Sequence, residues 1–201
     1  MMEPSFADWT PTGETGKSYR ARLASGFLGK YFSGPAVLDI GFRGQGPAEE
    51  ARPVVPHAIG VDLDYPGYDG ITLPFADETI DTVFSSHVLE HVVDYKAVIQ
   101  DWHRVLRVGG HIVCHVPHQH LYEKKLEPPS RFNEDHKRFY TPARLMAEFE
   151  ESLEPNSYRL RYMADFDEFN DYRAGPEIHG AWGYEIHMVL QKIAKPDWTL
   201  E

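Results

Sequence analysis

The chain has 201 residues, a hydrophobic content of 42% and a formal net charge of −11. This length is typical of one domain, which we expect to span residues 1–201. The acidic balance disfavours a general nucleic-acid or anionic-membrane binder, because phosphate contacts need a basic surface. A single cysteine, Cys114, excludes an internal disulfide framework and a zinc cluster of thiolates.

The sequence lacks two features that would direct a protein to a membrane or out of the cell. No apolar run approaches the roughly 18 residues of a membrane span. The first residues, MMEPSFADWT, lack the basic start and apolar stretch of a signal peptide. We therefore expect a soluble, cytoplasmic protein that has no membrane or nucleic-acid partner.

The first two thirds of the chain alternate predicted helices with predicted strands. Apolar spacing predicts a helix over 17–32, and short apolar runs predict strands at 36–41, 58–64, 79–86 and 111–117. A helix over 94–108 should begin at the N-cap Asp94 and end at Gly109-Gly110. Strands that alternate with helices predict an α/β fold with a Rossmann-like, doubly wound and mostly parallel sheet.

The C-terminal third follows a different pattern. Pro142 should open a helix after the cap Thr141. Residues 157–167 and 184–193 alternate apolar and polar side chains with no helix signal between them. We expect an antiparallel hairpin, within residues 157–193, at one edge of the sheet.

Acidic residues gather at the ends of the first two strands. Asp39 opens a glycine-rich turn, Asp39-Ile-Gly41-Phe-Arg-Gly44-Gln-Gly46, and Asp62 follows 23 residues later. Ligands of open α/β sheets bind at the carboxyl ends of the strands, and an acid after the second strand can hold ribose hydroxyls. The dinucleotide pattern G-x-G-x-x-G is absent, which disfavours NAD.

These motifs resemble those of class I S-adenosylmethionine-dependent methyltransferases. The resemblance covers residues 36–117, which would form the cofactor-binding core, and its most specific part is LPFADETIDTVFSSHVLEHVVDYKAVIQDWHRVLRVGGHIVCHVP (73–117). It implies that S-adenosylmethionine contacts the turn after the first strand, the acid of the second strand, the L-P-F segment and the end of the 79–86 strand. The implied cofactor residues are Asp39, Gly41, Phe42, Asp62, Leu63, Leu73, Pro74, Phe75, Ser86 and His87.

One segment departs from this family. Between Asp62 and Leu73 the chain is too short for the helix and strand that usually stand there. The adenine side of the site should therefore be built differently.

The string His87-x-x-Glu90-His91 matches the H-x-x-E-H pattern of one class of zinc peptidase. That pattern needs both histidines on one continuous helix and a distant third ligand. Here His87 directly follows a predicted strand, and no third ligand is evident. We expect no zinc site, and assign His91 to a hydrogen bond at a helix start or to the substrate.

Residues 118–145 form a predicted substrate loop that is rich in histidine, aromatic and charged residues. If the acceptor is a hydroxyl group, a nearby base would assist methyl transfer. His118 and His136 are the candidate catalytic bases, with His91 and His115 next. Besides His91, the candidate substrate-binding residues are Arg131, Arg138 and Tyr140.

The sequence supports three functions. The first is S-adenosylmethionine-dependent O-methylation of a sugar or other small polar acceptor, as in glycan-modifying members that the loop resembles. The second is methylation of an aromatic or quinone acceptor, and the third is non-catalytic cofactor binding. Asp135 with the loop histidines could also hold Mg²⁺, and the oligomeric state, including a homodimer, is left open.

Overall fold

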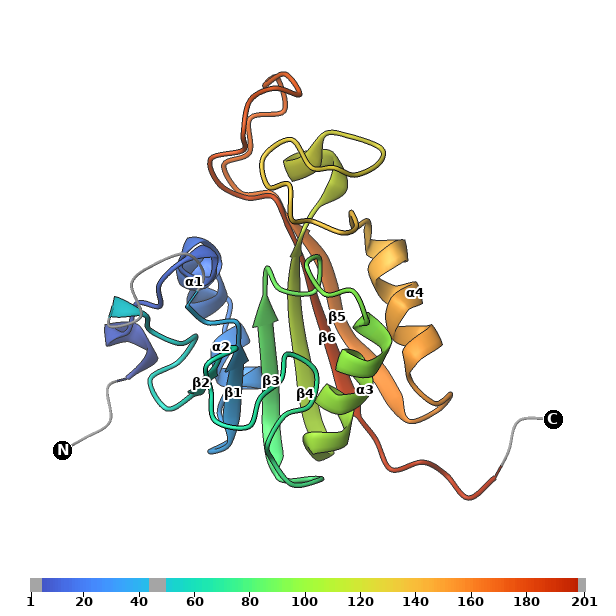
Figure 1. The fold of residues 1–201 in the computed structure, drawn as a ribbon. Helices are drawn as coiled ribbons and strands as arrows, with labels where there is room; N and C mark the ends of the chain where they lie inside the picture. Colours follow the sequence, from blue (N-terminus) through green and yellow to red (C-terminus); the bar gives the residue numbers. More distant parts are fainter. Residues whose placement is uncertain (1–4, 44–49, 199–201) are drawn as a thin grey trace.

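A computed structural model describes residues 5–43 and 50–198 of the chain (Figure 1). Its centre is a six-stranded sheet in the order β2-β1-β3-β4-β6-β5. The strands are β1 (Val37–Ile40), β2 (Ile59–Val61), β3 (Ile80–Ser86), β4 (Leu106–Pro117), β5 (Tyr158–Phe166) and β6 (Glu185–Lys192). Strands β1 to β4 pair in parallel, whereas β6 pairs antiparallel with both β4 and β5. The predicted fold class, including the C-terminal antiparallel hairpin, is confirmed.

Helices cover both faces of this sheet (Figure 1). The helical segments are η1 (Phe6–Asp8), α1 (Glu14–Ala24), α2 (Phe27–Tyr31), α3 (Tyr95–Val105), a π-helical turn η3 (Gln119–Glu123) and α4 (Pro142–Ser152). Side chains of α3 and α4 share one buried apolar cluster with β1, β3, β4 and β6, and side chains of α1 and α2 share another. Because strand side chains alternate between faces, β1, β3, β4 and β6 each contribute to both clusters.

The predicted N-terminal helix is present but broken. Instead of one helix over 17–32, α1 ends at Ala24 and α2 begins at Phe27. The break lies at Ser25-Gly26, where Gly26 has a φ of +76°. Glycine adopts this left-handed conformation readily, so it lets the chain turn between two short helices that the apolar spacing alone does not separate.

Helix α3 begins as predicted and ends earlier. The side chain of Asp94 accepts a hydrogen bond from the Ala97 N–H at 3.1 Å, which confirms the N-cap. Strand β4 follows at once from Leu106, so the prediction that Gly109-Gly110 end the helix is wrong. Both glycines lie within β4, and a side chain on Gly110 would meet the Asp81 carbonyl oxygen at 2.9 Å.

No helix or strand is present from Asp62 to Thr79, as the short segment predicted. Its backbone is instead held by α3. The N–H of Leu73 donates to Asp101 at 2.7 Å, and the Arg104 guanidinium donates to the carbonyl oxygens of Leu73 and Phe75. Arg104 is itself paired with Asp101 at 2.7 Å. This clamp fixes the Leu73–Phe75 segment beside the sheet.

Helix α4 begins at Pro142 as predicted, and the Thr141 side chain accepts from the Arg144 N–H at 3.3 Å. Across residues 5–43 and 50–198, no helix combines the length and apolar character that crossing a bilayer requires.

Candidate active site at the carboxyl end of the sheet

The strand order reverses between β1 and β3, since β2 lies on one side of β1 and all later strands lie on the other. Open α/β sheets bind ligands at such a point, outside the carboxyl ends of the strands. Ile40 pairs with both Val61 and Ser85, so Gly41, Asp62 and Ser86 emerge at the same edge. The structure thus brings together the predicted cofactor residues of three strands.

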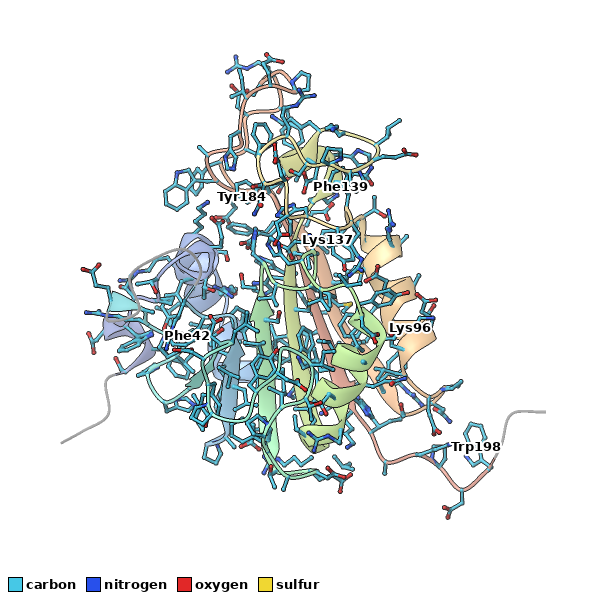
Figure 2. The ribbon with its side chains drawn as sticks, viewed as in Figure 1. Phe42, Lys96, Lys137, Phe139, Tyr184 and Trp198 are labelled. Carbon is cyan, nitrogen blue, oxygen red and sulfur yellow. The ribbon has the colours of Figure 1, made fainter. Side chains whose placement is uncertain are left out.

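The turn after β1 brings the backbone close to its neighbours. Gly41 has a φ of +72°, and a side chain there would lie 2.4 Å from a methyl group of Val88. The ring of Phe42 covers Gly60 of β2, on the β1 side of the molecule (Figure 2). The continuation of the turn, with Gly44 and Gly46, lies outside the described residues.

Asp62 and Leu63 have the character expected of a nucleoside contact. The Asp62 carboxylate is partly exposed, and the N–H of Leu63 donates to it at 2.8 Å, which leaves further acceptor capacity. The Leu63 side chain is 73% exposed although it is apolar. Asp62 also influences Tyr68. The pKa of Tyr68 rises to about 12, mainly because its hydroxyl is buried and secondly because of the negative charges of Asp62 and two other acids.

Asp39 is directed into the protein. Its carboxylate is buried and accepts a hydrogen bond from the Val54 N–H at 2.5 Å. Burial raises its pKa to about 7, although that hydrogen bond and the charge of Arg22 act in the opposite direction. The predicted cofactor contact of Asp39 remains a prediction, and in this structure the residue fixes the segment at Val54.

The three residues of the L-P-F segment occupy different environments. Leu73 is buried in the core, Pro74 is exposed, and the ring of Phe75 lies 5.8 Å from that of Tyr65. Their backbone positions are set by the Arg104 clamp.

Two buried hydroxyl groups lie at the end of β3. The side-chain oxygens of Ser85 and Ser86 are shielded from solvent and have no hydrogen-bond partner among residues 5–43 and 50–198. Buried polar groups in native proteins are normally hydrogen-bonded, so an orphaned hydroxyl at a ligand-binding edge indicates a missing partner. Ser86 was expected to contact the cofactor, whereas Ser85 was not singled out in the sequence.

His87 follows these serines in a strained backbone conformation, with a φ of +55°. Its Nε2 lies 3.1 Å from Glu185 and 3.9 Å from Glu14, and its Nδ1 lies 3.6 Å from Glu90. Burial lowers the pKa of His87, but the hydrogen bond with Glu185 and the three carboxylate charges outweigh it, and the pKa rises to about 9. Glu14 and Glu185 are distant along the chain, so no sequence pattern assigned them to this site.

A second histidine pair lies on the α1 face of the sheet. His115 of β4 and His187 of β6 pair across the strands, and their rings stack with centroids 3.8 Å apart. Arg22 of α1 reaches His115 Nδ1 at 3.1 Å, and His187 Nε2 lies 2.6 Å from Glu185. Burial is the main cause of the lowered pKa of both histidines. His115, a reserve candidate for the base, is therefore enclosed in the core.

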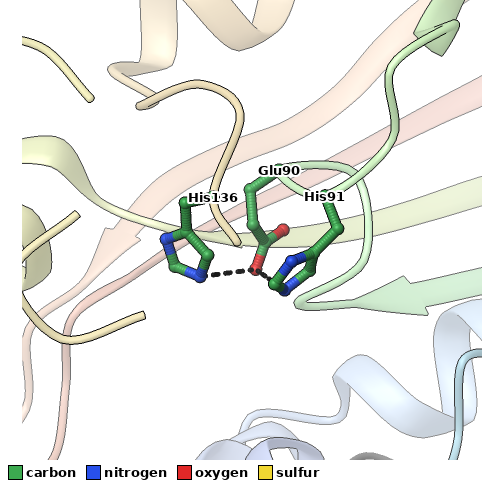
Figure 3. Close-up of side chains that lie close together, drawn as sticks. All are labelled: Glu90, His91 and His136. Atoms are coloured by element: carbon green, nitrogen blue, oxygen red, sulfur yellow. Dashed lines mark ion pairs between the residues drawn. The ribbon is translucent and has the colours of Figure 1, made fainter. Parts of the chain in front are cut away.

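Glu90, His91 and His136 converge just beyond His87 (Figure 3). The Nε2 atoms of His91 and His136 each lie 3.9 Å from Glu90 Oε1, and the two rings are 4.8 Å apart. No helix contains residues 87–93, so His87 and His91 do not lie on one helix as the zinc-peptidase motif requires. The two histidines also belong to different clusters. The loop folds back and places His136 beside Glu90 and His91, whereas His87 lies with Glu14 and Glu185. The absence of a zinc-peptidase site remains a prediction.

The two predicted bases are separated. His118 Nδ1 accepts a hydrogen bond from the His120 N–H at 3.0 Å, and its Nε2 lies 3.7 Å from Asp165. His136 Nδ1 is hydrogen-bonded to the Glu123 carboxylate, which can only accept. Nδ1 of His136 therefore carries the proton, so its Nε2 lone pair faces Glu90. The Nδ1 lone pair of His118 is already engaged.

Two of the other predicted substrate residues, Arg138 and Tyr140, make hydrogen bonds within the protein. Arg138 donates to the carbonyl oxygens of Leu89 and Val93, and the buried Tyr140 hydroxyl donates to Glu148 at 2.7 Å. Arg131 is exposed. Lys137 and Tyr184 lie beyond the upper ends of the central strands, near the Glu90 cluster and α1 respectively (Figure 2). Substrate contacts of Arg131, Arg138 and Tyr140 remain predictions.

A cavity of about 430 Å³ lies at the opposite end of the sheet, where β4 begins and β6 ends. Its lining includes Gln100, His103, Leu153 and Lys192. None of the predicted cofactor or catalytic residues borders it. We therefore locate the site from the strand order and the polar groups rather than from this cavity.

Sequence comparison connects this edge of the sheet with methyltransferases. A family described as "Methyltransferase domain" matches residues 47–114. Demethylmenaquinone methyltransferase of Alkalihalophilus pseudofirmus is 44% identical over 46 residues, which are 23% of this chain and 20% of that protein. Ubiquinone/menaquinone biosynthesis C-methyltransferase UbiE of Desulfotalea psychrophila is 38% identical over 55 residues, 27% of this chain and 22% of that protein. The chain thus matches about a fifth of the length of these relatives.

Solved structures extend the similarity to most of the chain. A complex of the Haloferax volcanii Trm112 methyltransferase activator with a proposed methyltransferase aligns with a TM-score of 0.58 at 15% identity, covering 90% of this chain and 94% of that one. A SAM dependent methyltransferase from Archaeoglobus fulgidus gives a TM-score of 0.55 at 16% identity, covering 89% and 96%. The [4+2]-cyclase SpnF gives 0.57 at 13% identity, covering 89% and 83%.

These structures share the Rossmann-like fold of this chain. At such low identity they show the fold alone. The family match over residues 47–114 adds the sequence pattern of β2, β3, α3 and the first part of β4. The chain therefore has the fold of class I S-adenosylmethionine-dependent methyltransferases, and its residues 47–114 match the family described as "Methyltransferase domain".

Proposed function

We propose that the protein transfers the methyl group of S-adenosylmethionine to a hydroxyl oxygen of a small acceptor. The observation that carries this proposal is that an accessible carboxylate, an exposed leucine and the Ser86 hydroxyl, which has no partner among the described residues, lie at the carboxyl ends of the strands beside the β1/β3 reversal. Asp62 would hold the ribose diol, Leu63 and Phe75 the adenine, and the end of β3 the methionine part. The carboxylates around His87 provide a favourable environment for the positive sulfonium.

The part of the site where the methyl acceptor would bind contains a group that can take up its proton. In the transfer, the acceptor oxygen bonds to the methyl carbon, the carbon–sulfur bond breaks, and its electron pair returns to sulfur. The hydroxyl proton must leave, and the free Nε2 lone pair of His136 is the available acceptor. Glu123 holds the His136 ring in the tautomer that this step requires.

The test is a transfer assay with methyl-labelled cofactor and matched acceptors. A sugar diol and a phenol would be compared with their O-methylated forms, and S-adenosylhomocysteine would be measured as the second product. We expect label only in acceptors that have a free hydroxyl. Label on carbon, or cofactor binding without transfer to any acceptor, would contradict the proposal.

A quinone acceptor is the second candidate. The curated relatives named above act in demethylmenaquinone or ubiquinone/menaquinone methylation, and UbiE is named a C-methyltransferase. The loop between β5 and β6, which projects at the top of Figure 1, exposes Phe169, Tyr172 and Trp182. Such side chains could cover an apolar acceptor. A reduced naphthoquinone in the same assay, with the methylated atom determined by NMR, distinguishes the two candidates.

A further inference from the structure

We propose that Glu90, His91 and His136 bind a divalent transition-metal ion through one carboxylate oxygen and two imidazole nitrogens. Three protein ligands would leave a coordination position open to water or to a substrate oxygen, as in catalytic zinc sites. Figure 3 shows the three side chains close together, and Glu90 and His91 follow a few residues after the carboxyl end of β3.

The spacing of the donor atoms fits one ion. One potential ligand atom from each residue lies within 4.8 Å of the others, and both Nε2 atoms are 3.9 Å from Glu90 Oε1. Zinc–ligand distances of about 2.0–2.1 Å in a tetrahedron place ligand atoms roughly 3.4 Å apart. Both distances to Glu90 exceed this separation by about half an ångström, and the three ligand atoms all lie within 4.8 Å of one another, so the cluster would have to contract around an ion.

Both histidines are oriented for metal binding by carboxylates behind them. His91 Nδ1 lies 3.1 Å from Asp135, and His136 Nδ1 is hydrogen-bonded to Glu123. Since a carboxylate only accepts, each Nδ1 carries the proton and each Nε2 lone pair faces Glu90. A ligating histidine characteristically donates its other N–H to such an outer carboxylate. Two separate histidine–carboxylate pairs show this arrangement, so coincidence explains it poorly.

Glu90 itself lacks partners. Its side chain is 0% exposed, and within the described part of the chain neither carboxylate oxygen has a hydrogen-bond partner. His87 Nδ1, at 3.6 Å, is beyond hydrogen-bonding distance. A buried carboxylate without a hydrogen bond is costly unless a cation or donor joins it. A metal ion bound between Glu90 and the two Nε2 atoms would supply that missing partner.

Two other clusters of potential ligands are already satisfied. In the cluster of His115, Glu185 and His187, the guanidinium of Arg22 contacts His115, and Glu185 is hydrogen-bonded to His187. In the cluster of Glu14, His87 and Glu185, Glu14 accepts from Lys17 at 2.8 Å. Arg22 and Lys17 disfavour a metal at these two places. At Glu90 the neighbouring cationic group is His87, whose Nδ1 is 3.6 Å away and makes no hydrogen bond with the carboxylate.

The ligand set selects the kind of metal. Imidazole nitrogen suits Zn²⁺, Fe²⁺ and neighbouring ions, whereas Mg²⁺ prefers oxygen ligands and retains water. We therefore expect Zn²⁺ or Co²⁺ to bind and Mg²⁺ to bind weakly. His91 is only partly buried, which provides a route for the ion from solvent.

The metal ion would activate the acceptor hydroxyl for methyl transfer, and this role rests on the proposed function. An acceptor hydroxyl bound at the open position would become more acidic, because the cation stabilises its conjugate base. Its proton would pass to water, the oxygen would take the methyl carbon, and the carbon–sulfur electron pair would return to sulfur. Metal binding and proton acceptance use the same His136 lone pair, so the metal would replace His136 as the group that activates the hydroxyl.

The experiment begins with protein that has been treated with a chelator and then freed of it. Zn²⁺ is titrated by calorimetry, and Co²⁺ by its visible absorption, both without cofactor. We expect about one ion per chain. The substitutions Glu90→Gln and His136→Asn should each weaken Zn²⁺ binding by at least 100-fold. Asp135→Asn, which weakens the support of His91 and also removes an exposed ion pair with Lys137, should weaken it by about 10–100-fold.

His103→Asn, at the opposite end of the sheet, is the matched control and should leave Zn²⁺ affinity unchanged. Circular dichroism and S-adenosylmethionine affinity verify that each variant is folded. Absence of Zn²⁺ binding by the folded native chain, or unchanged binding by His136→Asn, would overturn the metal site. S-adenosylmethionine binding without Zn²⁺ binding would contradict the metal site alone, whereas Zn²⁺ binding without any transfer would contradict the proposed function alone.

Discussion

The carboxylate of Asp62 lies at the carboxyl end of β2 and has acceptor capacity beyond its bond with the Leu63 N–H. Two oxygens of one carboxylate suit a vicinal diol. Asp62→Ala should weaken S-adenosylmethionine binding by roughly 1.5–3 kcal/mol, the range for hydrogen bonds to a charged group. Isothermal titration calorimetry measures this loss. Asp171→Ala, in the exposed β5–β6 loop, is the control, and equal affinities of the two variants would refute the ribose contact.

Asp39 makes stability depend on pH. Its pKa is about 7 in the folded protein, against 3.8 ordinarily, because it is buried. The folded state therefore holds this proton more tightly than the unfolded state. The contribution to the free energy of unfolding is greatest below about pH 4, declines as pH rises to about 7, and is constant above that. The decline is at most about 4 kcal/mol, at 1.36 kcal/mol per pKa unit.

Asp39→Asn should remove this component. Urea unfolding at several pH values between 4 and 8, without cofactor, measures the native chain and the variant. We expect the difference in stability to shift in favour of the variant as pH rises. Asp64→Asn, whose native carboxylate is exposed and paired with Arg43, should follow the native curve. Parallel curves for Asp39→Asn and the native chain would show that Asp39 titrates normally.

Among the elements, α3 depends on its first turn. Asp94→Ala leaves the Ala97 N–H without its side-chain acceptor. Loss of an N-cap typically costs about 1 kcal/mol, within roughly 0.5–2 kcal/mol. Chemical denaturation should show this loss, and Asp94→Ser should restore most of it because serine can also cap. If serine were no better than alanine, the capping interpretation would be wrong.

Helix starts that depend on neighbouring residues could be predicted from the sequence. Boundaries that depend on contacts between distant residues could not. Asp94, Thr141 and Pro142 act within one helical turn, so the starts of α3 and α4 were visible in the sequence. The end of α3 depends on pairing of Leu106 with Ile80, a contact between distant residues. Packing of Gly110 against the Asp81 backbone then requires glycine inside β4, where local rules suggest a helix end.

The residues of the site also fall into those that could be predicted from the sequence and those that could not. Residues directly after a strand, such as Asp62 and Ser86, could be placed because parallel strands end at one edge. His136 could not be placed beside Glu90, since 46 residues separate them and an irregular loop sets the approach. The partnership of Glu185 with His87 likewise depends on the register of β6. Residue type identified the chemistry, but only the tertiary fold identified the neighbours.

At the scale of the whole molecule, Arg22 joins the N-terminal layer to the sheet. Its guanidinium donates to the Thr15 carbonyl at 2.6 Å and contacts His115 Nδ1 at 3.1 Å. Burial is the main reason that its pKa falls to about 10. Arg22→Met should lower the free energy of unfolding by roughly 2–5 kcal/mol, because buried polar partners lose their donor. Urea denaturation measures the change.

Arg20 provides the comparison on the same helix. Its side chain is exposed and donates to the Ala7 carbonyl at 3.1 Å. Arg20→Met should change stability by no more than about 0.5 kcal/mol. Similar effects of the two substitutions would mean that the N-terminal helix is not anchored through Arg22.

The shortened chain between Asp62 and Leu73 also determines how the sheet ends. With no strand beyond it, β2 is an edge of only three residues, Ile59–Val61. The other edge, β5, has nine residues, but a register shift between Leu160 and Tyr162 and the exposed Arg159 and Arg161 interrupt it. Short, irregular or charged borders are poor templates for another chain's strand. Both borders therefore oppose fibril-like stacking of copies during folding and storage.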